Sequence, residues 1–159
     1  MAVVKREICL TKSAKETQRL GEILAKNILK NVFKYNPIVL ALNGDLGSGK
    51  TTFIQGFAKG LGVKQKILSP TFVILKRFEV KKSKRFKNFF HIDCYRLKDQ
   101  KDLASLGLRD IFKDPGNIIA LEWPKRIKRI LPKETFVLDF KFLDKEIREV
   151  VNNKNLFGC

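Results

Sequence analysis

Residues 44–51 read GDLGSGKT and contain the strongest chemical signal of the sequence. They match the pattern of a glycine, any four residues, a glycine, a lysine and then serine or threonine. Glycines at these positions allow a tight turn in which successive backbone N–H groups point at one anion. In such a loop Lys50 contacts the β- and γ-phosphates of a nucleotide, and the Thr51 hydroxyl ligates Mg²⁺. The alternative is a glycine-rich turn that binds nothing.

The segments on either side of this loop favour the phosphate-binding interpretation. Residues 38–42 form a short continuous apolar run, which is typical of a strand buried on both faces. Residues 51–61 have a helical pattern that ends near Gly60 and Gly62. A helix N-terminus directly after a glycine loop adds partial positive charge at the place where a phosphate would lie.

Two acidic residues follow apolar segments that we expect to be strands. Glu122 ends the segment 117–122, and Asp93 follows the segment 86–92. Ligands bind at the carboxyl ends of parallel strands, so both acids would lie beside the phosphate loop. We expect one of them to serve a metal ion and the other to position water, although these residues alone do not assign the two roles. For Glu122 the alternative is an ordinary strand end that faces water.

The remaining pattern predicts an α/β domain with a mainly parallel central sheet and antiparallel additions. Ser13 and Glu16 form a capping box at the start of a helix over residues 14–31. Other expected elements are strands at 3–10, 72–80, 86–92, 135–143 and 146–151, a short helix at 102–108, and an exposed basic turn at 81–85. Residues 1–159 are expected to form one domain.

Composition excludes several classes of protein. No apolar run is long enough to span a bilayer and no apolar leader is present, so we expect a cytoplasmic protein without a membrane segment. Cys9, Cys94 and Cys159 are far apart, and His91 is the only histidine. We therefore expect reduced cysteines, with neither a disulfide framework nor a structural zinc site.

The chain is strongly basic. It has 33 Lys and Arg residues against 16 Asp and Glu residues, a formal net charge of +17. Basic side chains cluster between Lys76 and Lys87, and again between Lys125 and Lys133. These clusters are either solvated faces or a surface for a polyanion or an acidic partner, and the sequence leaves both interpretations open.

Five motifs in a fixed order resemble one known family. GDLGSGKTT at 44–52 is followed by SPTF at 69–72, HIDCYRL at 91–97, LGLRD at 106–110 and LEWP at 121–124. Over residues 5–140 this order and spacing resemble TsaE, also called YjeE, the small bacterial ATPases of the tRNA threonylcarbamoyladenosine pathway. The resemblance implies a P-loop NTPase-like fold that uses ATP and Mg²⁺.

The resemblance also implies roles for individual residues. Lys50 and Asp93 would be catalytic, with Asp93 facing the γ-phosphate and the attacking water. Thr51 and Glu122 would serve the metal ion. The switch-like residues would be Ser69 and Thr71. The nucleotide-binding residues would be Thr17, Gly44, Asp45, Leu46, Gly47, Ser48, Gly49, Lys50, Thr51, Thr52 and Asp93.

The function implied is ATP hydrolysis that supports the complex of TsaD and TsaB, which forms N6-threonylcarbamoyladenosine at position 37 of tRNA. Hydrolysis would be slow alone and activated in the complex, with Arg96, Arg109 or a partner supplying an arginine finger. Direct tRNA contact is left open. The alternatives are a small-molecule P-loop kinase and a nucleotide-gated binding module with incidental hydrolysis.

Trp123 either reports nucleotide binding or points into the core on the far side of the sheet.

Overall fold

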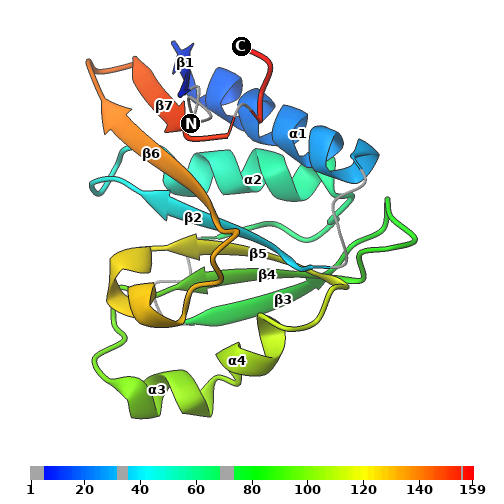
Figure 1. Cartoon of the computed structure of the whole chain (residues 1–159). Coiled ribbons are helices and arrows are strands. Elements are labelled where there is room, and N and C mark those ends of the chain that lie inside the picture. Colours follow the sequence, from blue (N-terminus) through cyan, green and yellow to red (C-terminus); the bar gives the residue numbers. More distant parts are fainter. Residues whose placement is uncertain (1–5, 32–35, 69–73, 155) are drawn as a thin grey trace, which may run out of the picture.

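The computed structural model describes residues 6–31, 36–68, 74–154 and 156–159 (Figure 1). The beginnings of the strands predicted at 3–10 and 72–80 lie outside these ranges, as do Ser69 and Thr71, which were predicted to be switch-like. Over the described residues the chain has the α/β architecture that the sequence predicts.

The described strands form one mixed sheet in the order β1-β7-β6-β2-β5-β4-β3. Their bounds are β1 Glu7–Thr11, β2 Ile38–Asn43, β3 Leu75–Glu79, β4 Asn88–Asp93, β5 Asn117–Glu122, β6 Phe136–Phe142 and β7 Arg148–Asn152. β2 pairs in parallel with β5 and β6, and β4 pairs in parallel with β5. β1, β7 and β3 are added by antiparallel pairing. The predicted parallel centre with antiparallel additions is confirmed.

Helices lie on both sides of the sheet (Figure 1). They are α1 Ala14–Lys30, α2 Lys50–Gly60, α3 Gln100–Ser105, α4 Leu108–Ile111 and the 3-10 helix η1 Pro124–Ile130. Successive strand residues point to opposite faces. Leu40 and Ile118 therefore pack under α1 and α2, whereas Val39 and Ile119 pack with the residues of α4 and η1. Among the described helices, none is long and apolar enough to cross a membrane.

α1 begins at the predicted cap. The Ser13 side chain accepts a hydrogen bond from the backbone N–H of Glu16 at 3.1 Å. The carboxylate of Glu16 accepts from the N–H of Lys12 at 2.7 Å, instead of from the N–H of Ser13 that a capping box uses. The sequence thus located the helix start, while the second half of the capping contact differs by one residue.

The helices of the second face differ from the prediction. One helix was expected at 102–108, and the structure has α3 and α4 on either side of Gly107. α3 starts earlier because the Asp99 side chain caps it, accepting from the N–H groups of Lys101 and Asp102. η1 was not predicted. Short helices such as these are held by contacts with the sheet, here through Leu108 and Ile127, and leave a weak periodic signal.

The β3–β4 connection agrees with the prediction of an exposed basic turn. Lys81, Lys82 and Lys84 are exposed there. The backbone N–H of Lys82 donates to the carbonyl of Leu61 at 3.3 Å, so the turn lies against the end of α2.

The expectation of three reduced cysteines is wrong for two of them. Cys9 on β1 and Cys159 form a disulfide across a sequence separation of 150 residues, while Cys94 is free and buried. No local pattern in the sequence predicts this pair, because only folding brings residues 156–159 beside β1. With Glu7, the two cysteines also form a group whose ligand atoms lie within 4.8 Å of one another.

α1 and α2 pack at very close range. Gly56 of α2 lies directly on the backbone of α1, and a Cβ placed there would overlap the carbonyl oxygen of Gln18. The obstacle is main chain rather than a flexible side chain, so a larger residue cannot be accommodated unless the two helices separate.

Gly56→Ala is therefore expected to destabilise the protein by about 3 kcal/mol, near the upper end for overpacked cores, despite alanine's better helix propensity. Urea unfolding followed by circular dichroism would measure the change. Lys59→Ala, at an exposed site of the same helix, is the control and should change stability by no more than about 0.5 kcal/mol. Equal unfolding midpoints for the two variants would contradict the packing argument.

Candidate nucleotide-binding site

The glycine loop joins the end of β2 to the start of α2, as the sequence predicted. Gly49 is the N-cap of α2 and has a φ of 101°, a left-handed conformation that favours glycine. Because the chain turns there, α2 begins at Lys50 with its unpaired N–H groups and its partial positive charge at the loop. This is the local arrangement that binds phosphate groups.

The ammonium group of Lys50 is buried within the loop. Its Nζ atom donates to the carbonyl oxygens of Gly44 at 2.6 Å and Asp45 at 3.0 Å, and lies 4.6 Å from the centroid of the Trp123 ring. Burial lowers the pKa of Lys50, whereas the negative charges of Glu122, Asp45 and Asp93 act to raise it. A partly desolvated cation of this kind gains free energy from an anionic ligand.

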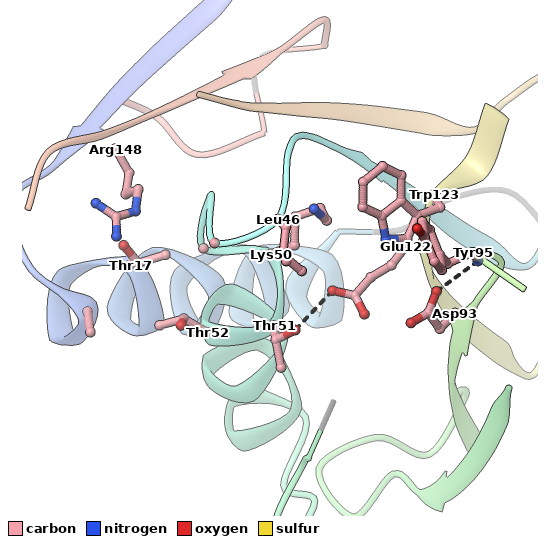
Figure 2. A pocket seen from close by; sticks show the side chains of 13 residues that line it. Thr17, Leu46, Lys50, Thr51, Thr52, Asp93, Tyr95, Glu122, Trp123 and Arg148 are labelled. Atoms are coloured by element: carbon pink, nitrogen blue, oxygen red, sulfur yellow. Dashed lines mark hydrogen bonds between the residues drawn. The ribbon is translucent and has the colours of Figure 1, made fainter. Parts of the chain in front are cut away.

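Glu122 ends β5 and faces the first turn of α2. The Thr51 hydroxyl donates to Oε1 of Glu122 at 3.0 Å (Figure 2). The other carboxylate oxygen of Glu122, Oε2, lies 3.3 Å from Nε2 of His91, which is fully buried on β4. Hydroxyl and carboxylate oxygens are the ligand type that Mg²⁺ prefers, so this pair fits a divalent cation.

Asp93 ends β4 and is the register partner of Glu122 across the parallel strands. Its Oδ1 accepts a hydrogen bond from the backbone N–H of Tyr95 at 2.9 Å. Burial raises the pKa of Asp93 and the negative charge of Glu122 raises it further, while the Tyr95 hydrogen bond and the charges of His91 and Lys50 lower it. Two carboxylates in such surroundings attract a cation.

Trp123 follows Glu122 in the sequence, yet both side chains line the same cavity. Consecutive strand residues normally point to opposite faces. Trp123 breaks this rule because its backbone is left-handed, with φ 58° and ψ 49°, a conformation that bulky residues rarely adopt. The structure combines the two alternatives for Trp123, since the indole lines the cavity beside Lys50 and also packs against the core on the α4 and η1 face.

These residues surround one cavity of about 410 Å³, a volume typical of small-ligand sites. It is lined by Ala14, Thr17, Leu46, Gly47, Gly49, Lys50, Thr51, Thr52, Asp93, Tyr95, Glu122, Trp123 and Arg148. Three of the predicted nucleotide-binding residues do not line it. Gly44 and Asp45 contribute carbonyls to Lys50, and Ser48 is buried.

Sequence reasoning missed Arg148. This residue begins β7, opposite Thr11 of β1, and its guanidinium lies 4.4 Å from the centroid of the Phe142 ring. It lies beside Thr17, at the opposite end of the cavity from Asp93 and Trp123 (Figure 2). No motif surrounds Arg148, so nothing in the sequence distinguished it from the other arginines.

The arginines singled out in the sequence do not line this cavity. Arg109 lines a separate hollow of about 430 Å³ with residues of α3, α4 and η1. Arg96 is likewise absent from the nucleotide-sized cavity. Of the described arginines, Arg148 is the one that lines it.

Comparisons with known proteins assign the chain to a family. Residues 11–150 match the family model described as threonylcarbamoyl adenosine biosynthesis protein TsaE. The chain belongs to the TsaE family. Among similar relatives, TsaE of Rickettsia prowazekii is 37% identical over 145 residues, covering 91% of this chain and 88% of the relative. TsaE of Bacillus subtilis is 38% identical over 112 residues, covering 70% of this chain and 66% of the relative.

The TsaE family assignment extends to the fold. The crystal structure of YdiB from Bacillus subtilis superposes with a TM-score of 0.71 at 28% identity, covering 99% of this chain and 93% of that one. The predicted P-loop NTPase-like fold is confirmed. The TsaE match spans the cavity from Ala14 to Arg148 and leaves out both disulfide cysteines.

Trp123 provides a direct test of the TsaE site, because it is the only tryptophan of the chain and touches Lys50. A nucleotide phosphate that draws Lys50 away from the indole is expected to change tryptophan emission saturably. A fluorescence titration with ADP or ATP and Mg²⁺ measures this, and Lys50→Ala should abolish the change. Unphosphorylated adenosine is the control. Calorimetric saturation without any change in emission would contradict the placement.

Proposed function

We propose that this chain is a Mg²⁺-dependent ATPase that converts ATP and water to ADP and phosphate. One observation carries the proposal. The buried Lys50, the hydrogen-bonded pair Thr51 and Glu122, and Asp93 all line one cavity at the N-terminus of α2. A nucleoside triphosphatase needs a phosphate-binding loop, a metal-side acid and a water-positioning group, and these residues supply all three.

Lys50 and the N–H groups at the start of α2 would bind the β- and γ-phosphates. Lys50 would exchange the carbonyls of Gly44 and Asp45 for phosphate oxygens and so stabilise the charge that develops during in-line attack. Thr17 and Arg148, at the other end of the cavity, would contact the nucleoside. The guanidinium of Arg148 offers a flat cationic face for a base or donors for a ribose hydroxyl.

Thr51 and Glu122 would hold Mg²⁺, with His91 orienting the carboxylate from the opposite side. Held there, Mg²⁺ would supply positive charge that neutralises the phosphate groups. Asp93 would orient the attacking water through a carboxylate oxygen. The raised pKa of Asp93 suits this role, because a carboxylate whose pKa is raised is a stronger base and accepts a proton more readily.

The family assignment supports a role in the biosynthesis of threonylcarbamoyladenosine in tRNA. We propose that residues 1–159 act as one cytoplasmic ATPase domain with TsaD- and TsaB-like partners. Hydrolysis would be slow alone, because neither Arg96 nor Arg109 lines the cavity as an arginine finger would. The exposed basic turn at Lys81, Lys82 and Lys84 would suit an acidic partner face or tRNA phosphates.

The first test is Lys50→Ala. We expect ATP affinity to fall at least about 100-fold, because a charge-assisted contact is lost and a desolvated site remains. Isothermal titration calorimetry measures affinity, and reconstituted tRNA modification measures function. Lys59 is an exposed lysine near the other end of α2. Lys59→Ala is therefore the matched control and should behave as wild type. Wild-type affinity and turnover in Lys50→Ala would reject the ATPase proposal. If the wild-type chain instead transferred phosphate to a small acceptor without partner proteins, it would be a kinase.

Asp93→Asn and Glu122→Gln should separate chemistry from metal binding. Asp93→Asn is expected to bind ATP with Mg²⁺ normally but to hydrolyse it at least about 100-fold more slowly, because a group that positions water and accepts its proton is lost. Glu122→Gln should instead require about tenfold more Mg²⁺ for half-maximal activity. Single-turnover hydrolysis over a Mg²⁺ series measures both. If complex assembly and repeated tRNA modification persist in Asp93→Asn, the chain is a nucleotide-gated binding module.

A further inference from the structure

We propose that Cys9 and Cys159 form a reversible thiol–disulfide site that locks residues 156–159 onto the corner formed by β1, α1 and α2. The proposal does not depend on the ATPase function. Both cysteines lie outside residues 11–150, the part that matches the TsaE family, so the family match says nothing about this site.

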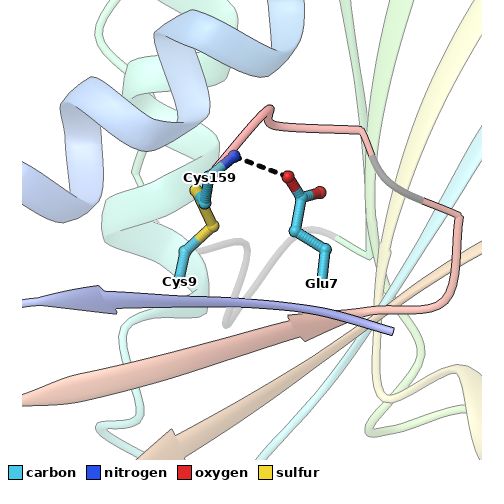
Figure 3. Close-up of side chains that lie close together, drawn as sticks. All are labelled: Glu7, Cys9 and Cys159. Carbon is cyan, nitrogen blue, oxygen red and sulfur yellow. Dashed lines mark hydrogen bonds between the residues drawn. A yellow bond between two sulfur atoms is a disulfide. The ribbon is translucent and has the colours of Figure 1, made fainter. Parts of the chain in front are cut away.

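Figure 3 shows the disulfide that joins Cys9 to Cys159, and these two residues differ in exposure. Cys9 lies in the middle of β1 with 4% of its surface exposed. Cys159 is exposed. A dissolved thiol or disulfide therefore reaches Cys159 first, whereas burial shields Cys9 from direct attack.

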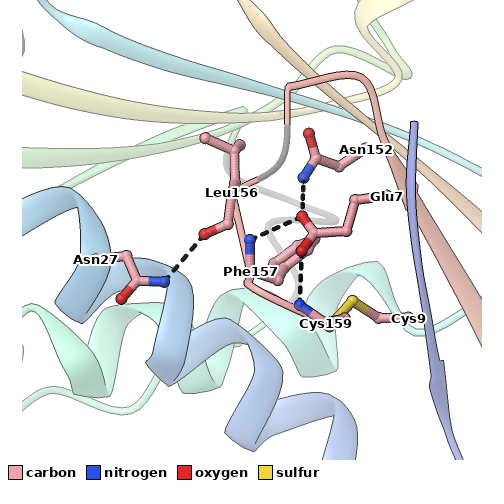
Figure 4. The surroundings of a disulfide bond; sticks show 7 residues. All are labelled: Glu7, Cys9, Asn27, Asn152, Leu156, Phe157 and Cys159. Carbon is pink, nitrogen blue, oxygen red and sulfur yellow. Dashed lines mark hydrogen bonds between the residues drawn. A yellow bond between two sulfur atoms is a disulfide. The ribbon is translucent and has the colours of Figure 1, made fainter. Parts of the chain in front are cut away.

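A buried carboxylate holds the segment in place independently of the sulfur atoms. Oε2 of Glu7 accepts hydrogen bonds from the Asn152 side chain at 2.7 Å and from the backbone N–H of Phe157 at 2.8 Å. Oε1 accepts from the backbone N–H of Cys159 at 2.7 Å (Figure 4). These bonds keep Cys159 beside Cys9 when both are thiols, and this preorganisation favours closure of the disulfide.

The segment also contacts both helices that carry the candidate site. The Phe157 ring is buried and meets the Phe53 ring of α2 edge-on, with centroids 6.1 Å apart. The Asn27 side chain of α1 donates to the carbonyl of Leu156 at 3.0 Å. Closing the disulfide therefore ties β1, α1 and α2 together through one short segment.

The chemistry requires a two-electron oxidant, for which we name a small-molecule disulfide such as oxidised glutathione. The Cys159 thiolate attacks it, forming a mixed disulfide and releasing one glutathione thiolate. Cys9 then loses its proton to solvent and attacks the Cys159 sulfur, which expels the second glutathione. Two protein thiols are oxidised and one glutathione disulfide is reduced, and excess glutathione reverses both steps.

The experiment equilibrates the full chain in glutathione buffers of graded ratio, alkylates free thiols and locates them by mass spectrometry. We expect Cys9 and Cys159 to be lost from the alkylated pool together while Cys94 remains a thiol. Cys94→Ala should keep the transition, and Cys159→Ser should abolish it. The oxidised protein should melt roughly 5–15 °C higher than the reduced protein.

Two further readouts distinguish a locking segment from an incidental pair of thiols. Reduction should speed amide hydrogen exchange in β1 and residues 156–159 but not in β4 or β5. Glu7→Gln leaves both cysteines in place but removes the carboxylate that holds residues 156–159. Its disulfide should therefore be less stable, and half-oxidation should require a ratio of oxidised to reduced glutathione at least about tenfold higher. Three free thiols at every ratio would overturn the proposal. So would an unchanged midpoint in Glu7→Gln, or stoichiometric zinc bound by the reduced chain.

Discussion

The parallel pairing of β5 with both β2 and β4 is the constraint on which the candidate site depends. The register sets Leu42 opposite Glu122 and Glu122 opposite Asp93, so three strands end at the same edge of the sheet. α2 starts at that edge because the loop after β2 is too short to lead elsewhere. A shift of one residue in either pairing would turn Glu122 or Asp93 toward the opposite face of the sheet.

Charge in a partly desolvated place then gives the site its chemical character. The buried ammonium group of Lys50 faces Glu122 and Asp93, and burial disfavours the charged forms of Lys50 and Asp93. In the protein alone, Lys50 is held by carbonyl dipoles and an aromatic face, which are weak partners for a full charge. Polyphosphate and a divalent cation together would satisfy both signs of charge, which neither could do alone.

The antiparallel strands β7 and β1 extend the sheet beyond its parallel centre, and β7 contributes Arg148 to the cavity while β1 contacts Thr17, which also lines it. Arg148 reaches the cavity from β7, and Thr11 of β1 shares a 2.7 Å hydrogen bond with Thr17. The same strand carries Glu7 and Cys9 on its buried face, alternating with exposed residues. The end of the cavity opposite Asp93 and Glu122 is thus connected through β1 to residues 156–159.

Local signals in the sequence determined the elements and much of the site. The glycine pattern and the cap at Ser13 are read within a few residues, and Glu122 and Asp93 were found because strand ends converge in any parallel sheet. The structure alone decided what depends on distant segments or on a single backbone angle. Arg148 reaches the cavity, and Cys9 separately meets Cys159, because of the order of the antiparallel strands. No local pattern encodes that order. Trp123 turns toward the site through one left-handed residue, which strand alternation cannot anticipate.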